Sequence, residues 1–505
     1  MSSGTLIAQF RQNVVDSGRS PGKAWAGFVI AWAALFLILN MPLLEGLKPE
    51  GQAVLAVMVW ACLMWVFECV PPGISGLLIP MLLVMTGGSS PFPKAASGFT
   101  TPVLFLCLSA FLFAAIMQAA GLDRRIALVL LHKMKATTVN GVIWSMFVVN
   151  LVLSFIIPAA NARAATLLPV INGITNFFGD SAAERDGKKA IVIQTLVYGS
   201  MISGMCILTA HLPNLVIVSL FEKQLKLQLS YVDWFIMQWP YLGMFVITQW
   251  WVQYFFKTRG TSIQGGYQAV ERQRAELPRM TVSEWLIVAV FALIALMWMF
   301  EDPIVKNWVK TLRSHNAALI GLALLFIPGL FRFKWQDIQN RTIWGTILLL
   351  AGALSLSGAM ADSGLARYLA DKLHPVSTGE AWWWILLVFM VGTHIMRLGM
   401  LSNVAAITMI APILIALAPK LGLHPVAFTM LVADTDTFAY ILPTQITAAV
   451  IAYSSGTFTA SDYAKVGIVS VLIAIAYGIC VMAPWYAFVG VPVWDPAAAW
   501  PFKKL

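Results

Sequence analysis

Polar side chains interrupt two long apolar segments of this sequence at matched places. Asn161 and Arg163 lie in one segment, and Ser402 and Asn403 lie in the other. Amide and hydroxyl oxygens suit a hard cation such as sodium, whereas a guanidinium group and free backbone amides attract a carboxylate. Because polar groups are costly in apolar surroundings, the pattern predicts a binding site for a small anion and a coupling ion.

Two more apolar segments, 190–221 and 437–461, contain residues that break helices. Backbone groups freed by such a break are tolerated in a membrane only where protein or a cavity satisfies them. We expect both breaks to line the same site, because paired interrupted segments are the best sequence indication of a transporter binding site. The candidate residues at these breaks are Ala210, His211, Pro213, Asn214, Gln445 and Thr447.

Charged residues near the second polar segment extend the candidate site. His394 and Arg397 precede Ser402, and Asp434 and Asp436 lie in an otherwise apolar helix. Histidine and aspartate side chains are candidates for proton coupling. Two interpretations of Arg397 stay open, because it could line the site or form a structural salt bridge with one of the aspartates.

The composition indicates which solvent surrounds the chain. Hydrophobic residues make up 59% of the 505 residues and charged residues 11%, against about 25% charged residues in soluble domains. So few charges cannot cover a soluble surface, and we expect an all-α polytopic membrane protein with about 11 transmembrane spans. The net charge of +10 lies mainly in short loops, which is typical of membrane topology and does not indicate nucleic acid.

Basic loops predict the orientation of these spans. The polar N-terminal arm and the 257–280 linker carry clusters of Lys and Arg. The positive-inside bias places both in the cytoplasm, and the protein in the inner (plasma) membrane. The first apolar run, 24–44, is longer than the apolar region of a cleaved signal peptide, so we interpret it as a retained span.

The two halves of the chain repeat one order of features. Gly121 and Gly364 each precede a short amphipathic helix, Pro169 and Pro412 each follow the polar residues, and both pairs are 243 residues apart. The repetition predicts inverted repeats with two re-entrant hairpins and two broken helices, unless it is a duplicated passive scaffold. The predicted divisions are 1–23 (cytoplasmic arm), 24–94 (first scaffold spans), 95–256 (repeat one), 257–280 (cytoplasmic linker), 281–341 (scaffold spans), 342–461 (repeat two) and 462–505 (last span and tail).

Several segments resemble one transporter family. Trp65-Val-Phe-Glu68-Cys-Val-Pro71 is similar to the early Trp-x-x-Glu-x-x-Pro segment of this family. Residues 105–131 and 344–373 are similar to the family's two pairs of span and interfacial helix, and residues 441–456 are similar to its second broken-helix loop. Over about residues 50–480 the chain resembles the divalent anion/sodium symporters, the di- and tricarboxylate transporters. The resemblance implies a homodimer, separate scaffold and transport domains, elevator-type movement, and hairpin tips that hold substrate carboxylates and sodium.

The chain departs from the Ser-Asn-Thr signatures of that family. The first signature position holds Ala159-Ala160-Asn161, and the second keeps Ser402-Asn403 but has Val404. Few side-chain oxygens therefore remain for sodium, and Asn403 is the remaining candidate ligand. The candidate substrate residues are Asn161, Ala162, Arg163, His211, Pro213, Asn214, Ser402, Asn403, Val404 and Thr447, and the candidate coupling residues are Ala210, Ser402, Asn403, Gln445, His394, Arg397, Asp434 and Asp436.

A fixed cation at the site would change the coupling. We hypothesise that Arg163, together with Arg397 or His394, supplies the positive charge that sodium provides in the symporters. Transport would then be organic-anion exchange or proton-coupled, with weak sodium dependence. The alternatives are a sodium-coupled dicarboxylate, sulfate or sulfonate symporter and, in another class, an anion channel. Neither HExxH nor GxSxG stands at a plausible site, so we expect no enzyme and no cofactor beyond a coupling sodium ion or proton.

Overall fold

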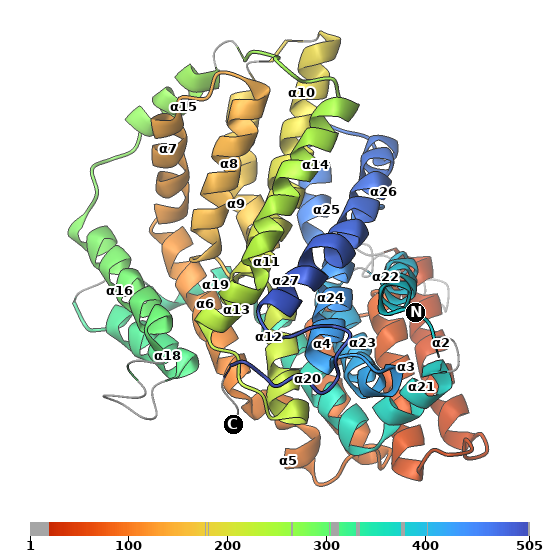
Figure 1. Ribbon diagram of the computed structural model, residues 1–505. Helices are drawn as coiled ribbons and strands as arrows, with labels where there is room; N and C mark the ends of the chain where they lie inside the picture. The colour runs from red at the N-terminus through yellow and green to blue at the C-terminus, as the bar shows by residue number, and fades with distance from the viewer. Residues whose placement is uncertain are drawn as a thin grey trace, which may run out of the picture.

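The described part of the chain is helical (Figure 1). The computed structural model describes residues 20–176, 178–179, 181–263, 266–301, 304, 313–329, 334–374, 379–400 and 402–502, so residues 1–19 of the predicted cytoplasmic arm lie outside it. Among the described residues, eight helices are long and apolar enough to cross a membrane, and four shorter apolar helices accompany them. The predicted all-α polytopic fold is confirmed.

The first helices begin at prolines, whose fixed φ and missing N–H suit the first turn of a helix. α4 packs closely on α20 because both carry glycines at the crossing. A Cβ on Gly73 would lie 2.7 Å from the Cα of Gly345, and one on Gly352 would overlap the backbone of Gly76. The helices that begin at prolines are α2 (Pro21–Asn40), α3 (Pro49–Val66) and α4 (Pro72–Met85). The elements α5 (Phe92–Ala95) and η1 (Ser97–Thr100) follow them, and α20 spans Trp344–Asp362.

Repeat one contains a hairpin and a broken helix. A single helix needs about 20 residues to span a bilayer, and α8 and α9 are each shorter than that. The two helices meet at a tip over 155–159. The next helix is interrupted between Cys206 and Leu212. The elements are α6 (Pro102–Ala119), α7 (Leu122–Met134), α8 (Val139–Ser154), α9 (Ala160–Thr175), α10 (Ala182–Val192), η2 (Ile193–Gly199), α11 (Ser200–Cys206), η3 (Leu208–Ala210), α12 (Leu212–Leu220) and η4 (Phe221–Leu225).

The helices between the repeats pass from one half of the chain to the other. α15 lies against the interfacial helix α7, where Tyr267 stacks on His132 with ring centroids 5.5 Å apart. The elements are α13 (Tyr231–Gln238), η5 (Trp239–Tyr241), α14 (Leu242–Phe255), α15 (Gly266–Ala275), α16 (Val282–Met299), α18 (Ser314–Leu325) and α19 (Trp335–Arg341).

Repeat two has the same order as repeat one. The interfacial helices α7 and α21 each follow a glycine with positive φ, +67° at Gly121 and +79° at Gly364, a conformation that residues with a Cβ adopt only at a cost. The second hairpin has its tip between the end of α22 at Arg397 and the start of α23 at Asn403, and the second broken helix is interrupted over 438–446. The elements are α20, α21 (Leu365–Leu373), α22 (Trp382–Arg397), α23 (Asn403–Leu417), η7 (Ala418–Leu421), α24 (Pro425–Thr437), α25 (Thr447–Tyr453), α26 (Ala460–Tyr477), η8 (Gly478–Met482) and α27 (Ala483–Phe488).

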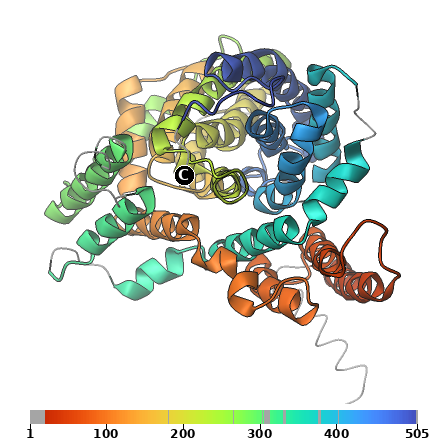
Figure 2. The same cartoon turned by 60° about the horizontal axis from the view of Figure 1, so that its bottom comes forward.

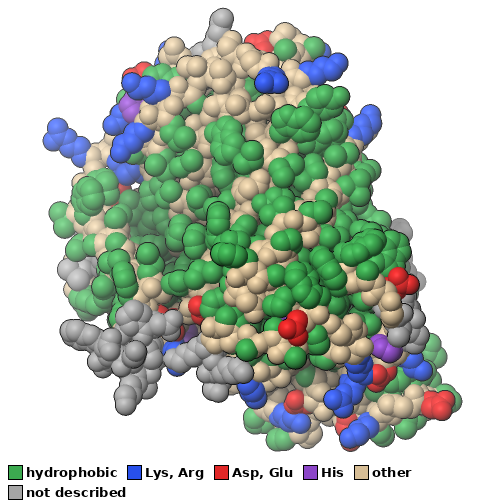
Figure 3. Space-filling model, in the orientation of Figure 1, with side chains coloured by type: hydrophobic (Ala, Val, Ile, Leu, Met, Phe, Trp, Pro, Cys, Tyr) green, Lys and Arg blue, Asp and Glu red, His purple; other side chains and the backbone are tan. Residues whose placement is uncertain are grey.

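The helices form two groups. Figure 2 shows the red-orange and teal helices as a row along one side of a bundle of yellow, green and blue helices. In Figure 3 hydrophobic side chains cover most of the middle of the visible face, whereas Lys and Arg side chains gather at its upper and lower ends. Such a band is typical of a surface in contact with lipid.

Candidate functional site

The hairpin tips and the helix breaks of both repeats meet at one cavity of about 340 Å³. The N-terminal residues of α9, α12, α23 and α25 form one wall, and the turn between α3 and α4 and the start of α20 form the other. The lining residues are Trp65, Glu68, Pro71, Pro72, Gly73, Phe111, Ala159, Ala160, Asn161, Met201, His211, Leu212, Pro213, Ile343, Gly345, Thr346, Leu349, Ser402, Asn403, Val404, Ile446, Thr447 and Ala448.

Three of the helices that begin at this cavity have no side-chain cap. Ala159, His211 and Ile446 precede α9, α12 and α25, and none of them accepts a hydrogen bond from the first turn. Among the other described helices, α10, α13, α16 and α26 begin with a complete capping box, whereas α2, α3, α4 and α6 also begin without a side-chain cap. Uncapped N-termini leave backbone N–H groups free, and those groups together with the helix dipole attract an anion.

The capping box of α10 illustrates the side-chain hydrogen bonds that the uncapped helices at the cavity lack. The Ser181 hydroxyl accepts from the Glu184 N–H, and the Glu184 carboxylate accepts from Ser181 and from the Gly179 N–H. The orphan donors of α10 are therefore occupied by protein, whereas those at the cavity are available to a ligand.

Arg163 lies behind the cavity wall and is completely buried. Its Nη1 donates to the carbonyl of Ile157 at 2.7 Å and to that of Ala210 at 2.9 Å, and its Nη2 donates to the carbonyl of Ser200 at 2.6 Å. One guanidinium group therefore ties the tip of the first hairpin to the break of the first broken helix. No described carboxylate lies within ion-pair distance of Arg163, so its charge is not neutralised by a side chain.

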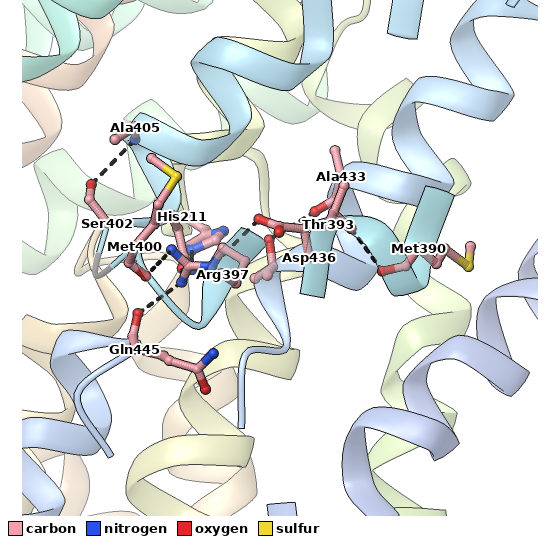
Figure 4. A network of polar contacts seen from close by, with 12 residues as sticks. His211, Met390, Thr393, Arg397, Met400, Ser402, Ala405, Ala433, Asp436 and Gln445 are labelled. Atoms are coloured by element: carbon pink, nitrogen blue, oxygen red, sulfur yellow. Dashed lines mark hydrogen bonds and ion pairs between the residues drawn. The ribbon is translucent and has the colours of Figure 1, made fainter. Parts of the chain in front are cut away.

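Arg397 has the corresponding place in repeat two (Figure 4). Its Nη1 donates to the carbonyl of Met400 at 3.0 Å, and its Nη2 donates to the carbonyl of Gln445 at 2.8 Å and to Oδ1 of Asn403. The second tip and the second break are thus tied by a guanidinium as well. Here a counter-charge is present, because Nε lies 3.7 Å from Oδ2 of Asp436, and both side chains are fully buried.

A hydrogen bond joins the two repeats at the cavity. Nδ2 of Asn403 lies 3.2 Å from Nε2 of His211, so the second hairpin tip contacts the first helix break. Gln445 closes its own break by accepting from the N–H groups of Ile441 and Leu442 at 3.0 and 2.7 Å. The cavity wall is therefore fixed by hydrogen bonds within and between the repeats.

Comparisons with known proteins agree with this architecture. Residues 22–491 match the family described as sodium:sulfate symporter transmembrane region. The chain belongs to this family. It is similar to a membrane protein of Cupriavidus necator (28% identity, covering 92% of this chain and 93% of the relative) and to the sodium-dependent dicarboxylate transporter SdcS of Staphylococcus saprophyticus (24% identity, covering 86% and 85%).

A solved structure shares the fold of this sodium:sulfate symporter family member. It is the Alcanivorax borkumensis YdaH transporter, which has been described as having an unusual topology. The TM-score is 0.53 at 13% sequence identity, and the match covers 87% of this chain and 99% of that chain. The chain is thus a multi-span member of a membrane transporter family, and an enzymatic activity is not expected of it.

The candidate residues of this symporter family member fall into two sets. One set lines the cavity, and the other lies behind its wall or apart from it. Arg163 belongs to the second set, because carbonyl oxygens of the tip, the break and α11 engage its guanidinium group. The cavity-lining candidates are Asn161, His211, Pro213, Ser402, Asn403, Val404 and Thr447, and the others are Ala162, Arg163, Ala210, Asn214, His394, Arg397, Asp434, Asp436 and Gln445.

Asp434 and His394 lie apart from the arginine networks. Oδ2 of Asp434 accepts from Nε2 of Gln238 at 2.8 Å and from the Tyr486 hydroxyl at 3.1 Å, so Asp434 does not pair with Arg397. Oδ1 of Asp434 and both ring nitrogens of His394 are buried without a hydrogen-bond partner among the described residues. Asn214 donates to the carbonyls of Gly204 and Ile207 at 3.1 and 3.2 Å. It therefore provides hydrogen-bond donors for backbone carbonyls at the first helix break.

The sequence analysis missed part of the opposite wall. Gly345 and Thr346 at the start of α20 line the cavity, as do Trp65 and Glu68 at the end of α3. Glu68 was noted only as part of a family-like segment. The only sequence signal at Gly345 was a glycine at the start of a span, which is compatible with close helix packing but does not identify the partner helix. Glu68 has a positive φ of +50°, is exposed, and lines the cavity.

Proposed function

We propose that this protein is a secondary active transporter of small organic anions with two or three carboxylates. We further propose elevator-type alternating access, a homodimer in the inner (plasma) membrane, and a cytoplasmic N-terminus. The single observation that carries the proposal is the cavity enclosed by two hairpin tips and two helix breaks, with uncapped helix N-termini directed at it. Carboxylate oxygens fit such free N–H groups.

The two buried guanidinium groups favour anion exchange or proton coupling over sodium symport. A sodium ion at a hairpin tip would need carbonyl oxygens from the tip and from the break. The carbonyls of Ile157 and Ala210, and those of Met400 and Gln445, accept hydrogen bonds from arginine instead. The charge of Arg163, which no described carboxylate neutralises, then offsets part of the substrate charge, so a mobile cation is not required for the anion to bind.

Asp434 is the candidate proton carrier in this proposal. Its carboxyl is almost completely buried, has no cationic partner among the described residues, and leaves Oδ1 unbonded. An isolated carboxylate is expensive inside a membrane, and protonation removes that cost. Stimulation of uptake by an inward proton gradient, and loss of that stimulation in Asp434→Asn, would support this role; equal stimulation of the variant would exclude it.

A sodium-coupled dicarboxylate symporter is the second candidate. The name of the staphylococcal relative favours it, because that relative is a sodium-dependent dicarboxylate transporter. Ser402 and Asn403 line the cavity in repeat two and retain oxygens for one sodium ion. The family description leaves sulfate as a further substrate of either mechanism.

Counterflow in liposomes tests the proposed function. Purified protein is reconstituted into vesicles loaded with one unlabelled anion, and uptake of the same labelled anion is followed for succinate, malate, citrate, 2-oxoglutarate, sulfate and ethanesulfonate. We expect saturable uptake of at least one carboxylate only in loaded vesicles, with protein-free vesicles as control. Absence of counterflow for every anion, or a flux that does not saturate, as in a channel, would contradict the proposal.

A further inference from the structure

A second recess lies at the opposite end of the helices that form the cavity. Its volume is about 860 Å³, and it opens between the α20–α21 turn, α5 and the segment that follows α12. In Figure 1 α5, α20 and α21 mark this lower end, far from α15. The lining residues are Gly46, Leu47, Lys48, Lys94, Ser97, Leu220, Lys223, Gln224, Gly358, Ala361, Asp362, Ser363, Gly364, Ala366, Arg367, Tyr368, Asp371 and Ala416.

Three helices connect the recess with the cavity. The three helices are α12, α20 and α23. Their N-terminal residues line the cavity, and their C-terminal residues, or the turn that follows the helix, line the recess. The helices pack on one another between the two hollows, and the Ser357 hydroxyl on α20 donates to the carbonyl of Thr408 on α23 at 2.9 Å. The two hollows are therefore separated by one packed seam, as the two sides of an alternating-access pathway must be.

Cations outnumber carboxylates in the recess. Asp362 pairs with Lys94 at 3.5 Å, and Asp371 pairs with Lys420, which lies outside the lining. No described carboxylate lies within ion-pair distance of Lys48, Lys223 or Arg367, which also line it. Lys223 makes a long hydrogen bond to the hydroxyl of Ser97, with Nζ 3.5 Å from Oγ, and the carboxylates of Asp362 and Glu222 act on it from beyond ion-pair distance.

Helix dipoles do not account for all of this charge. The C-terminal end of each of the three helices carries a partial charge of about −0.5, so together they offset about half of three unpaired cations. The recess remains electropositive by roughly 1.5 charges on that reckoning. An excess positive charge in a recess open to water raises the local concentration of anions.

We propose that the recess is a second anion-binding site, a vestibule that attracts the dianionic substrate at the membrane face away from the 257–280 linker. Lys223 and Arg367 supply its attraction, from η4 and from α21. The identity of the anion as substrate depends on the proposed function, whereas the electropositive character of the recess does not. The two parts are therefore tested separately.

Thiol modification tests the electrostatic part without any transport. Ser363→Cys, in a Cys480→Ser background, places a thiol in the recess and removes the exposed native cysteine. The reaction rates of an anionic and a cationic methanethiosulfonate are compared with those of 2-mercaptoethanol. We expect the anionic reagent to be favoured, and the double change Lys223→Gln and Arg367→Gln to lower that preference by about threefold. If the ratio of the anionic to the cationic reaction rate equals that of 2-mercaptoethanol, the proposed electropositive vestibule is wrong, even if transport is normal.

Transport kinetics test the substrate part. Succinate uptake, or uptake of whichever anion gives counterflow, is measured from each side of oriented vesicles. We expect the same double variant to raise the KM about threefold from the recess side only, and less at high salt. Lys465→Gln, an exposed cation on α26 outside the recess, should leave KM unchanged. Equal KM values in the variant and the wild type would show that the recess does not serve the substrate.

Discussion

The two repeats hold their hairpin tips with the same chemical group but under different charge conditions. Arg163 follows the first tip, and Arg397 precedes the second; each donates to the carbonyl oxygens of its tip and its break. Asp436 neutralises Arg397, whereas no described carboxylate neutralises Arg163. Repeat two therefore holds a buried ion pair at its tip, whereas repeat one retains a net positive charge beside the cavity.

Removal of Arg163 should have the largest effect. Arg163→Ala removes three buried hydrogen bonds to carbonyl oxygens, and hydrogen bonds from a charged donor are worth about 1.5–3 kcal/mol each. We expect transport to fall by at least about a hundredfold at that cost. Counterflow of the purified variant measures this, with size-exclusion chromatography to show that it is folded. A folded Arg163→Ala protein with normal transport would remove the fixed-cation hypothesis.

The second prediction concerns the stability of the protein and tests the ion pair that is present only in repeat two. Arg397→Leu leaves Asp436 buried and unpaired, which costs about 3–5 kcal/mol. The double change Arg397→Leu and Asp436→Leu should recover much of that loss, because no buried charge remains. Thermal unfolding in detergent compares the two. A double variant no more stable than the single one would mean that the ion pair is not the difference between the repeats.

A smaller change tests the position of the Arg163 guanidinium. A Cβ on Gly204 would lie 2.7 Å from Nη2 of Arg163, so Gly204→Ala should displace the guanidinium from its carbonyl partners. We expect about a tenfold loss of transport, from one weakened hydrogen bond to a charged group. Gly392→Ala is the matched control, because no atom lies within 4 Å of its added Cβ, and it should transport normally.

The smallest predicted effect comes from a substitution at Glu68, on the cavity wall that contacts neither arginine. Glu68 presents an exposed carboxylate at the rim and repels an anionic substrate. Glu68→Gln should lower the KM about twofold, which is the effect of one charge at about 10 Å in water. Glu50→Gln, near the other end of α3, serves as control. A large loss of transport in Glu68→Gln would instead indicate a direct role in coupling.

Much of the fold could be predicted from the sequence because its signals are local. Apolar runs, helix-breaking prolines and the glycines before the interfacial helices each determine structure within a few residues. The positions of Asn161 and Asn403 followed from the repeat, and both line one cavity. What a buried arginine contacts could not be predicted, because its partners are backbone carbonyls that carry no side-chain signature.

The opposite wall of the cavity illustrates the same limit. Gly345 and Thr346 lie beside the hairpin tips only because α4 and α20 cross closely through Gly73, Gly76 and Gly352. That crossing joins residues about 270 positions apart, and no local pattern determines which glycine faces which. Long-range packing therefore completes a site of which only the half built by the repeat could be predicted.

The central claim is that guanidinium groups replace sodium at the hairpin tips. The direct measurement is the initial rate of labelled substrate uptake into vesicles, with or without a sodium gradient and with or without internal substrate. We predict strong stimulation by internal substrate and no stimulation by sodium. Strong stimulation by sodium, with none by internal substrate, would contradict the account.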